Sequence, residues 1–145
     1  LPEIMQGDIL IDLNVINIKN ISDVITHMGI SSEPMQKSAR GVLVSRSSIN
    51  PAHLPASFDD DMALLALTHD LISFNALGEG AINVCGENGD IESGDMICTS
   101  SMPGKGMKQA AQESLKPYTV AQSRQSVTFS SPDEVKQIAC IYRAG

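Results

Sequence analysis

Aromatic residues and basic charge are both scarce in this chain of 145 residues, and each scarcity excludes a class of function. The three Phe and two Tyr stand singly and there is no Trp, so the stacking platforms of single-stranded nucleic-acid binders are not expected. Ten Lys and Arg against seventeen Asp and Glu give a net charge of -7, with no basic stripe for a phosphate backbone. We therefore expect no nucleic-acid partner.

Metal-binding cysteine motifs and long hydrophobic runs are also lacking. Cys85, Cys98 and Cys140 lie far apart, with no C-x-x-C pair and no zinc spacing to a histidine. Their odd number argues against a disulfide framework, and the apolar runs around Cys98 and Cys140 predict free, buried thiols. No signal peptide and no apolar run of membrane-spanning length is found, so we expect no membrane partner. The first residue is Leu1, which predicts a piece of a longer polypeptide, either a cleavage product or an excised segment.

Strand-like segments dominate what is present. Hydrophobic residues make up 42% of the chain, enough for the core of one domain over residues 1–145. Residues 7–18, "GDILIDLNVINI", alternate in polarity, with Ile9, Ile11, Leu13 and Val15 on one face, which predicts a half-buried strand. Further strands are expected at residues 40–46, 71–77, 80–85, 95–101, 118–131 and 134–145. The expected fold is mainly β, a compact sandwich or barrel-like domain.

One short helix is expected near the N-terminus. Ile21, Val24, Ile25 and Met28 follow helical spacing, Ser22 can act as N-cap, and a glycine follows at position 29. These signals predict a helix over residues 22–28. Residues 62–67 are ambiguous between a helical turn and a buried strand. Residues 47–61, with two prolines and three consecutive aspartates, are either a functional loop or an excursion against a partner.

Turn-forming residues are concentrated between positions 87 and 109, "ENGDIESGDMICTSSMPGKGMKQ". Asn-Gly suits a type I′ turn, and glycine tolerates the positive φ that such corners require. Gly-Asp opens an apolar strand twice, at residues 7–8 and 94–95. The residues that we expect to shape these turns are Asn88, Gly89, Gly94, Asp95, Pro103, Gly104 and Gly106.

Three features that could mark a metal, phosphate or catalytic site are better explained as parts of the structure. The carboxylates of Glu87, Asp90, Glu92 and Asp95 do not follow EF-hand spacing, so solvated turns are favoured over a metal site. The "PGKGMK" segment lacks the first glycine and the Ser/Thr of a phosphate-binding loop. The histidines at positions 27, 53 and 69 share no metal-ligand spacing, and no G-x-S-x-G elbow is present. We expect no metal and no cofactor.

The central segment nevertheless resembles a known family. Residues 78–109, with the strand "INV", the turn "ENGDIESGD", the strand "MICTSS" and the loop "PGKGMK", are similar to the peptidase G2 family. This family comprises the intramolecular-chaperone, autoproteolytic domains at the C-termini of phage tail fibre, tailspike and neck-appendage proteins. The flanking "RGVLVSR" and "YTVAQSRQSV" extend the resemblance over residues 40–127, so a family-like module over 40–145 would follow an N-terminal strand and helix in 1–39.

The resemblance implies an assembly function. Such domains form homotrimers that align the chains of the preceding fibre shaft of the same polypeptide, and many are released by self-cleavage at their N-terminal boundary. It therefore implies a location in the virion tail, or in the host cytoplasm during assembly, and an endopeptidase that acts once in cis rather than a turnover enzyme. Glu3 and Asp8 are the carboxylates near that boundary that could assist cleavage, although a turn role for Asp8 is favoured.

Two other functions stay open on the sequence alone. One is a receptor-binding or structural β module of a phage virion that is not cleaved. The other is a small enzyme whose site is built from residues 47–61, with His53 and the aspartates Asp59, Asp60 and Asp61 as its polar groups.

Overall fold

The computed structural model describes residues 4–50, 52 and 64–144, and this part of the chain is mainly β, as predicted. Its one helical element besides isolated turns is the short 3-10 helix η2 (Leu65–Leu67). The strands are β1 (Ile9–Asn20), β2 (Asp23–Ile30), β3 (Ala39–Ser48), β4 (Asp70–Asn75), β5 (Leu77–Cys85), β6 (Met96–Thr99), β7 (Gly106–Lys108), β8 (Thr119–Ser123) and β9 (Val135–Arg143). No helix in these residues is long and apolar enough to cross a membrane.

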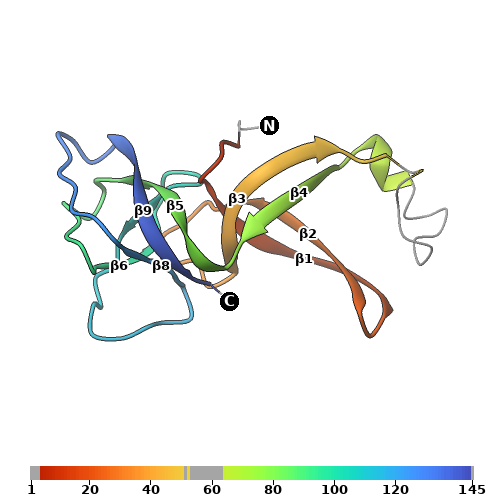
Figure 1. The fold of residues 1–145 in the computed structure, drawn as a ribbon, viewed down its shortest axis with the longest axis horizontal. Coiled ribbons are helices and arrows are strands. Elements are labelled where there is room, and N and C mark those ends of the chain that lie inside the picture. The colour runs from red at the N-terminus through yellow and green to blue at the C-terminus, as the bar shows by residue number, and fades with distance from the viewer. Residues whose placement is uncertain (1–3, 51, 53–63, 145) are drawn as a thin grey trace.

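The strands form a four-stranded sheet and a closed barrel. The sheet has the order β2-β1-β3-β4, and the barrel has the order β5-β7-β6-β8-β9. Neighbouring strands are antiparallel except for the short β5–β7 pair. Figure 1 shows the barrel at one end of the molecule and the sheet extending from it. The longest barrel ladder joins β5 to β9, from Leu77 opposite Arg143 to Cys85 opposite Val135.

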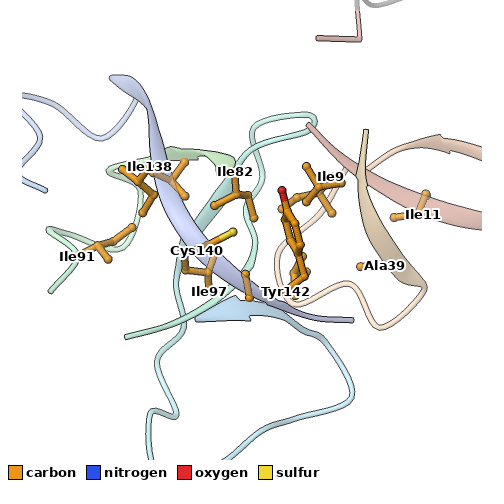
Figure 2. Close-up of a cluster of buried hydrophobic side chains, with 13 residues drawn as sticks. Ile9, Ile11, Ala39, Ile82, Ile91, Ile97, Ile138, Cys140 and Tyr142 are labelled. Atoms are coloured by element: carbon orange, nitrogen blue, oxygen red, sulfur yellow. The ribbon is translucent and has the colours of Figure 1, made fainter. Parts of the chain in front are cut away.

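A single core joins the barrel to the start of the sheet. Ile9, Ile11 and Val42 of the sheet are buried in one cluster with side chains from β5, β6, β8 and β9. Figure 2 shows Ile9 beside the ring of Tyr142, whose hydroxyl donates to the carbonyl of Ala81 and accepts from its amide. Each buried isoleucine contributes about 1.5–3 kcal/mol by leaving water. The base of the sheet is therefore fixed to the barrel by hydrophobic burial.

The helix predicted for residues 22–28 is wrong, because this segment is strand β2. It pairs with β1 in antiparallel register, from Leu10 opposite Ile30 to Asn20 opposite Asp23. Val24, Ile25 and Thr26 are consecutive β-branched residues, which lose side-chain freedom in a helix and fit a pleated sheet. The side-chain oxygen of Asn20 accepts the amide of Ser22, so the predicted N-cap region is the turn of a β-hairpin.

The strand predicted for residues 7–18 is confirmed, but its alternating burial is interrupted. Ile9, Leu10 and Ile11 are buried, whereas Leu13 and Val15 are about half exposed. Asn14 has a φ of 62°, and the register with β2 shifts between Asp12 and Ile16. A β-bulge of this kind bends a strand and increases its twist. It turns the second half of β1 away from the core.

Beyond this bulge the sheet divides into two projecting arms. β1 and β3 pair only through Ile9–Ile11 and Ala39–Val42, at the base. We call residues 12–29 of the β1–β2 hairpin the first arm, and residues 44–50 and 64–73 of β3, η2 and β4 the second arm. Figure 1 shows the two arms separating as they extend away from the barrel. The ambiguous residues 62–67 thus include a 3-10 turn at 65–67, while most of the predicted loop 47–61 lies outside the described residues.

Candidate functional site

Asp8, one of the two carboxylates considered for cleavage, lies in a buried polar network at the base of the sheet. Its Oδ1 accepts hydrogen bonds from Lys105 Nζ at 2.6 Å and Asn83 Nδ2 at 2.8 Å. Its Oδ2 accepts the amide of Met5 at 2.9 Å. The Asp8 side chain has no exposed surface, and Lys105 is 9% exposed. A carboxylate with both oxygens occupied in this way indicates a structural role; Glu3 lies outside the described residues.

The "PGKG" loop is what brings Lys105 to Asp8. The Ile9 amide donates to the Gly104 carbonyl, and the Gly104 amide donates to Ser31. Gly104 has a φ of 78°, and a Cβ there would lie 2.8 Å from Asp8 Cγ. Gly106 in β7 is equally tight, because a Cβ would lie 2.6 Å from Ile97 Cγ2. The ammonium of this loop therefore neutralises a buried carboxylate instead of facing a phosphate.

The remaining predicted turn residues lie in separate corners on the barrel surface. Gly89 and Gly94 have φ values of 92° and 97°, and a Cβ at either would meet nothing within 4 Å. Asn88 donates to the Lys108 carbonyl, and Asp95 accepts the amide of Glu92 within its own turn. Within the described residues no group of three or more histidines, cysteines or carboxylates is placed to hold a metal ion.

The three cysteines are free and fully buried, as predicted for Cys98 and Cys140. Burial raises the pKa of Cys98 to about 11 and that of Cys140 to about 12, because a thiolate loses its hydration in the core. Since the thiolate is the nucleophilic form, these two groups are unreactive at neutral pH. They fill space in the core.

An apolar groove with a cavity volume of about 820 Å³ lies between the two arms. From the first arm and its base it is lined by Leu10, Leu13, Val24 and Met28, and the facing side includes Leu43, Leu65, Leu71 and Phe74. This groove was not predicted from the sequence, because its two walls come from separate segments, within residues 4–30 and 40–74, that alternate or nearly alternate in polarity. Only the divergence of the arms creates it.

Two histidines meet across the groove. The rings of His27 in β2 and His69 before β4 lie edge to face, with centroids 4.9 Å apart. His69 Nδ1 shares a 2.8 Å hydrogen bond with the Thr68 hydroxyl. His27 Nε2 is buried and has no hydrogen-bond partner among the described residues.

Large apolar side chains are exposed along both arms. Ile18 is 75% exposed, Ile21 at the hairpin turn is 100% exposed, and Leu67 of η2 is 81% exposed. The others on the arms are Leu13, Val15, Ile16, Val24, Leu64 and Leu71. Single exposed apolar residues are ordinary, but a cluster over neighbouring elements marks a surface that another molecule covers.

The arms and their groove are therefore the candidate functional site, since the Asp8 network is closed and the thiols are buried. Comparisons of the chain with protein-family models, with curated proteins and with solved structures found no match. The chemistry available at the site is that of association: apolar surface, a groove, and few charges. Arg46 and Asp70, which also line the groove, are already paired at 2.6 Å.

Proposed function

We propose that this chain is an assembly domain that self-associates as a homotrimer and aligns the chains of a phage tail fibre or tailspike. The observation that carries the proposal is the apolar surface of the two arms, which a solitary chain leaves in water. The trimeric state and the phage fibre come from the resemblance of residues 40–127 to the intramolecular-chaperone domains. The fold class expected of such a domain agrees with the mainly β structure.

The division of the molecule into a barrel and two arms suits an assembly function. The barrel and the base of the sheet share one hydrophobic core, so they provide a fixed platform. The arms extend from that platform (Figure 1), and large apolar side chains along them are exposed. Interwoven β structure forms slowly, because distant segments must meet before any contact stabilises them. A domain that gathers three chains raises their effective concentration and sets their starting register.

Sedimentation velocity across a wide range of protein concentrations tests this proposal. We expect a trimer at micromolar concentration, with burial of the arms detectable as protection of their amides from hydrogen exchange. A lone subunit at these concentrations, with exchange in the arms as fast as in the surface turns, would overturn it.

Self-release at the N-terminal boundary is a separate part of the proposal. A polypeptide that carries the preceding shaft should be cut once at the N-terminal boundary of the domain. Glu3→Gln in the longer polypeptide should slow the cut if this carboxylate assists it. An intact product under conditions where the trimer forms would remove self-release and favour an uncleaved structural module of a virion.

A further inference from the structure

The turn of the first arm and the groove between the arms are complementary surfaces of one molecule. The turn presents Ile21, which is fully exposed, and Ile18, which is 75% exposed. The groove has a volume of about 820 Å³ and mostly apolar walls. Both surfaces are better accommodated against apolar atoms than against water.

The turn of the first arm lies outside the groove of its own chain. The groove is lined by residues 24–30 of β2, whereas residues 20–23 form the turn beyond them. Figure 1 shows this turn at the far end of the first arm, pointing away from the barrel. Ile21 is therefore available to a neighbouring chain.

We propose that the first-arm turn of one chain inserts into the groove between the arms of a second copy. This inference rests on the proposed self-association and assigns the contact that carries it. The two surfaces differ, so the contact is head to tail, and three such contacts around a three-fold axis close a ring with every turn and every groove used. A closed ring explains how trimers form without continued polymerisation.

Apolar side chains carry the proposed contact. His27 Nε2 is itself buried in the wall of the groove, so it is not exposed to an inserted turn. Arg46 and Asp70 line the groove as a 2.6 Å ion pair, which can stay intact during insertion.

Cross-linking between differently labelled copies tests the contact. An Ile21→Cys protein mixed with a Leu71→Cys protein should give a covalent heterodimer with a short bifunctional maleimide. Leu71 lines the groove and is 59% exposed, and the three native thiols are buried, so they contribute little background. A trimer that forms without this cross-link would overturn the insertion and leave the proposed function standing.

Charge substitutions give a second, independent readout. Ile21→Asp or Leu71→Asp should each weaken association by about tenfold or more, whereas Leu115→Asp, at a 53% exposed site in a barrel loop, should not. A mixture of the two weakened proteins should recover a heterodimer, because the intact turn of one fits the intact groove of the other. Circular dichroism should show that all three variants fold.

The outcomes separate the two proposals. Unchanged trimers of both Asp variants would overturn the insertion alone. A monomeric unmodified chain would overturn the proposed function and the insertion together. Leu71→Asp could prevent assembly of a polypeptide that carries the shaft while leaving the trimer of the chain alone unchanged. That result would identify the shaft as the occupant of the groove and would contradict insertion of a second copy.

Discussion

Asp8 and Lys105 are 97 positions apart in the chain, yet their side chains form a 2.6 Å ion pair in the base of the sheet. Taking two charges out of water is expensive, and their attraction compensates only when the geometry is good and other hydrogen bonds complete it. Asn83 and the Met5 amide complete it here. The pair therefore fixes the "PGKG" loop over the start of β1 more than it adds net stability.

Removing the Lys105 charge should show how much stability depends on the pairing of the buried Asp8. Lys105→Met leaves the Asp8 charge buried and unpaired, so we expect the free energy of unfolding to fall by about 3–5 kcal/mol. The double variant Asp8→Asn, Lys105→Met should recover part of the loss, because its carboxamide carries no charge. Urea denaturation followed by circular dichroism measures both. A loss of less than about 1 kcal/mol in Lys105→Met would contradict the buried pair.

The buried thiols should make stability fall in alkali. Cys98 and Cys140 ionise at about 9.0 when exposed, but burial raises their pKa values to about 11 and about 12. Below pH 9 both states keep their protons, so the thiols have no effect on the pH dependence there. Above pH 9 the unfolded chain releases protons that the folded chain retains, so stability decreases as pH rises toward 11.

The measurement is urea denaturation at several pH values between 7 and 11, with thiol labelling alongside. Each thiol should lower the folding equilibrium constant roughly tenfold per pH unit above 9. Cys140→Ser should lessen the slope. Rapid labelling of Cys98 in the folded chain at pH 8, or stability that rises between pH 9 and 11, would contradict the assignment.

At the scale of elements, the bulge at Asn14 decides where the first arm leaves the core. Asn14 has a φ of 62°, and the Asp12 side chain accepts its amide at 2.7 Å. Asn14→Gly should be nearly neutral, because glycine adopts positive φ readily. Asn14→Val should cost about 1–3 kcal/mol, because a β-branched residue is strained there. Thermal denaturation of the two variants measures the difference, and equal melting temperatures would show that the bulge is not needed.

Strand positions were largely predictable, because they depend on local alternation and β-branched residues. Residues 7–18, 40–46 and 71–77 were expected as strands and lie in β1, β3, β4 and the start of β5. The segment at 22–28 was mispredicted because its apolar spacing fits a helix, while pairing with β1 and three consecutive β-branched residues decide for a strand. The spacing of apolar residues within one segment does not show which strand that segment pairs with.

The candidate site was less predictable than the fold. Of the expected turn residues, Gly89, Gly94 and Gly104 have positive φ, whereas Gly106 lies in strand β7. The Asp8–Lys105 pair and the His27–His69 contact were not expected, because each joins residues that only the tertiary structure brings together. The groove depends on the early separation of β1 from β3 after three paired positions, which no pattern in either strand records.

At the scale of the whole molecule, one end is closed and the other is open. The barrel has no free sheet edge, whereas the outer strands β2 and β4 of the sheet are edge strands that carry exposed apolar residues. Exposed edges and apolar faces invite non-specific association unless a specific partner covers them. Self-association through the arms would resolve this conflict, because the aggregation-prone end of each chain becomes the interior of the assembly.

Thermal stability should therefore depend on protein concentration. If three folded chains bind one another and the unfolded chains do not, mass action raises the melting temperature as concentration increases. Calorimetry over a hundredfold range of concentration should show this rise for the unmodified chain and for Leu115→Asp, which alters the barrel end. Ile21→Asp should melt at a temperature that barely changes with concentration over the same range. A melting temperature independent of concentration for the unmodified chain would mean that the apolar arms are stable alone in water, which contradicts the assembly function.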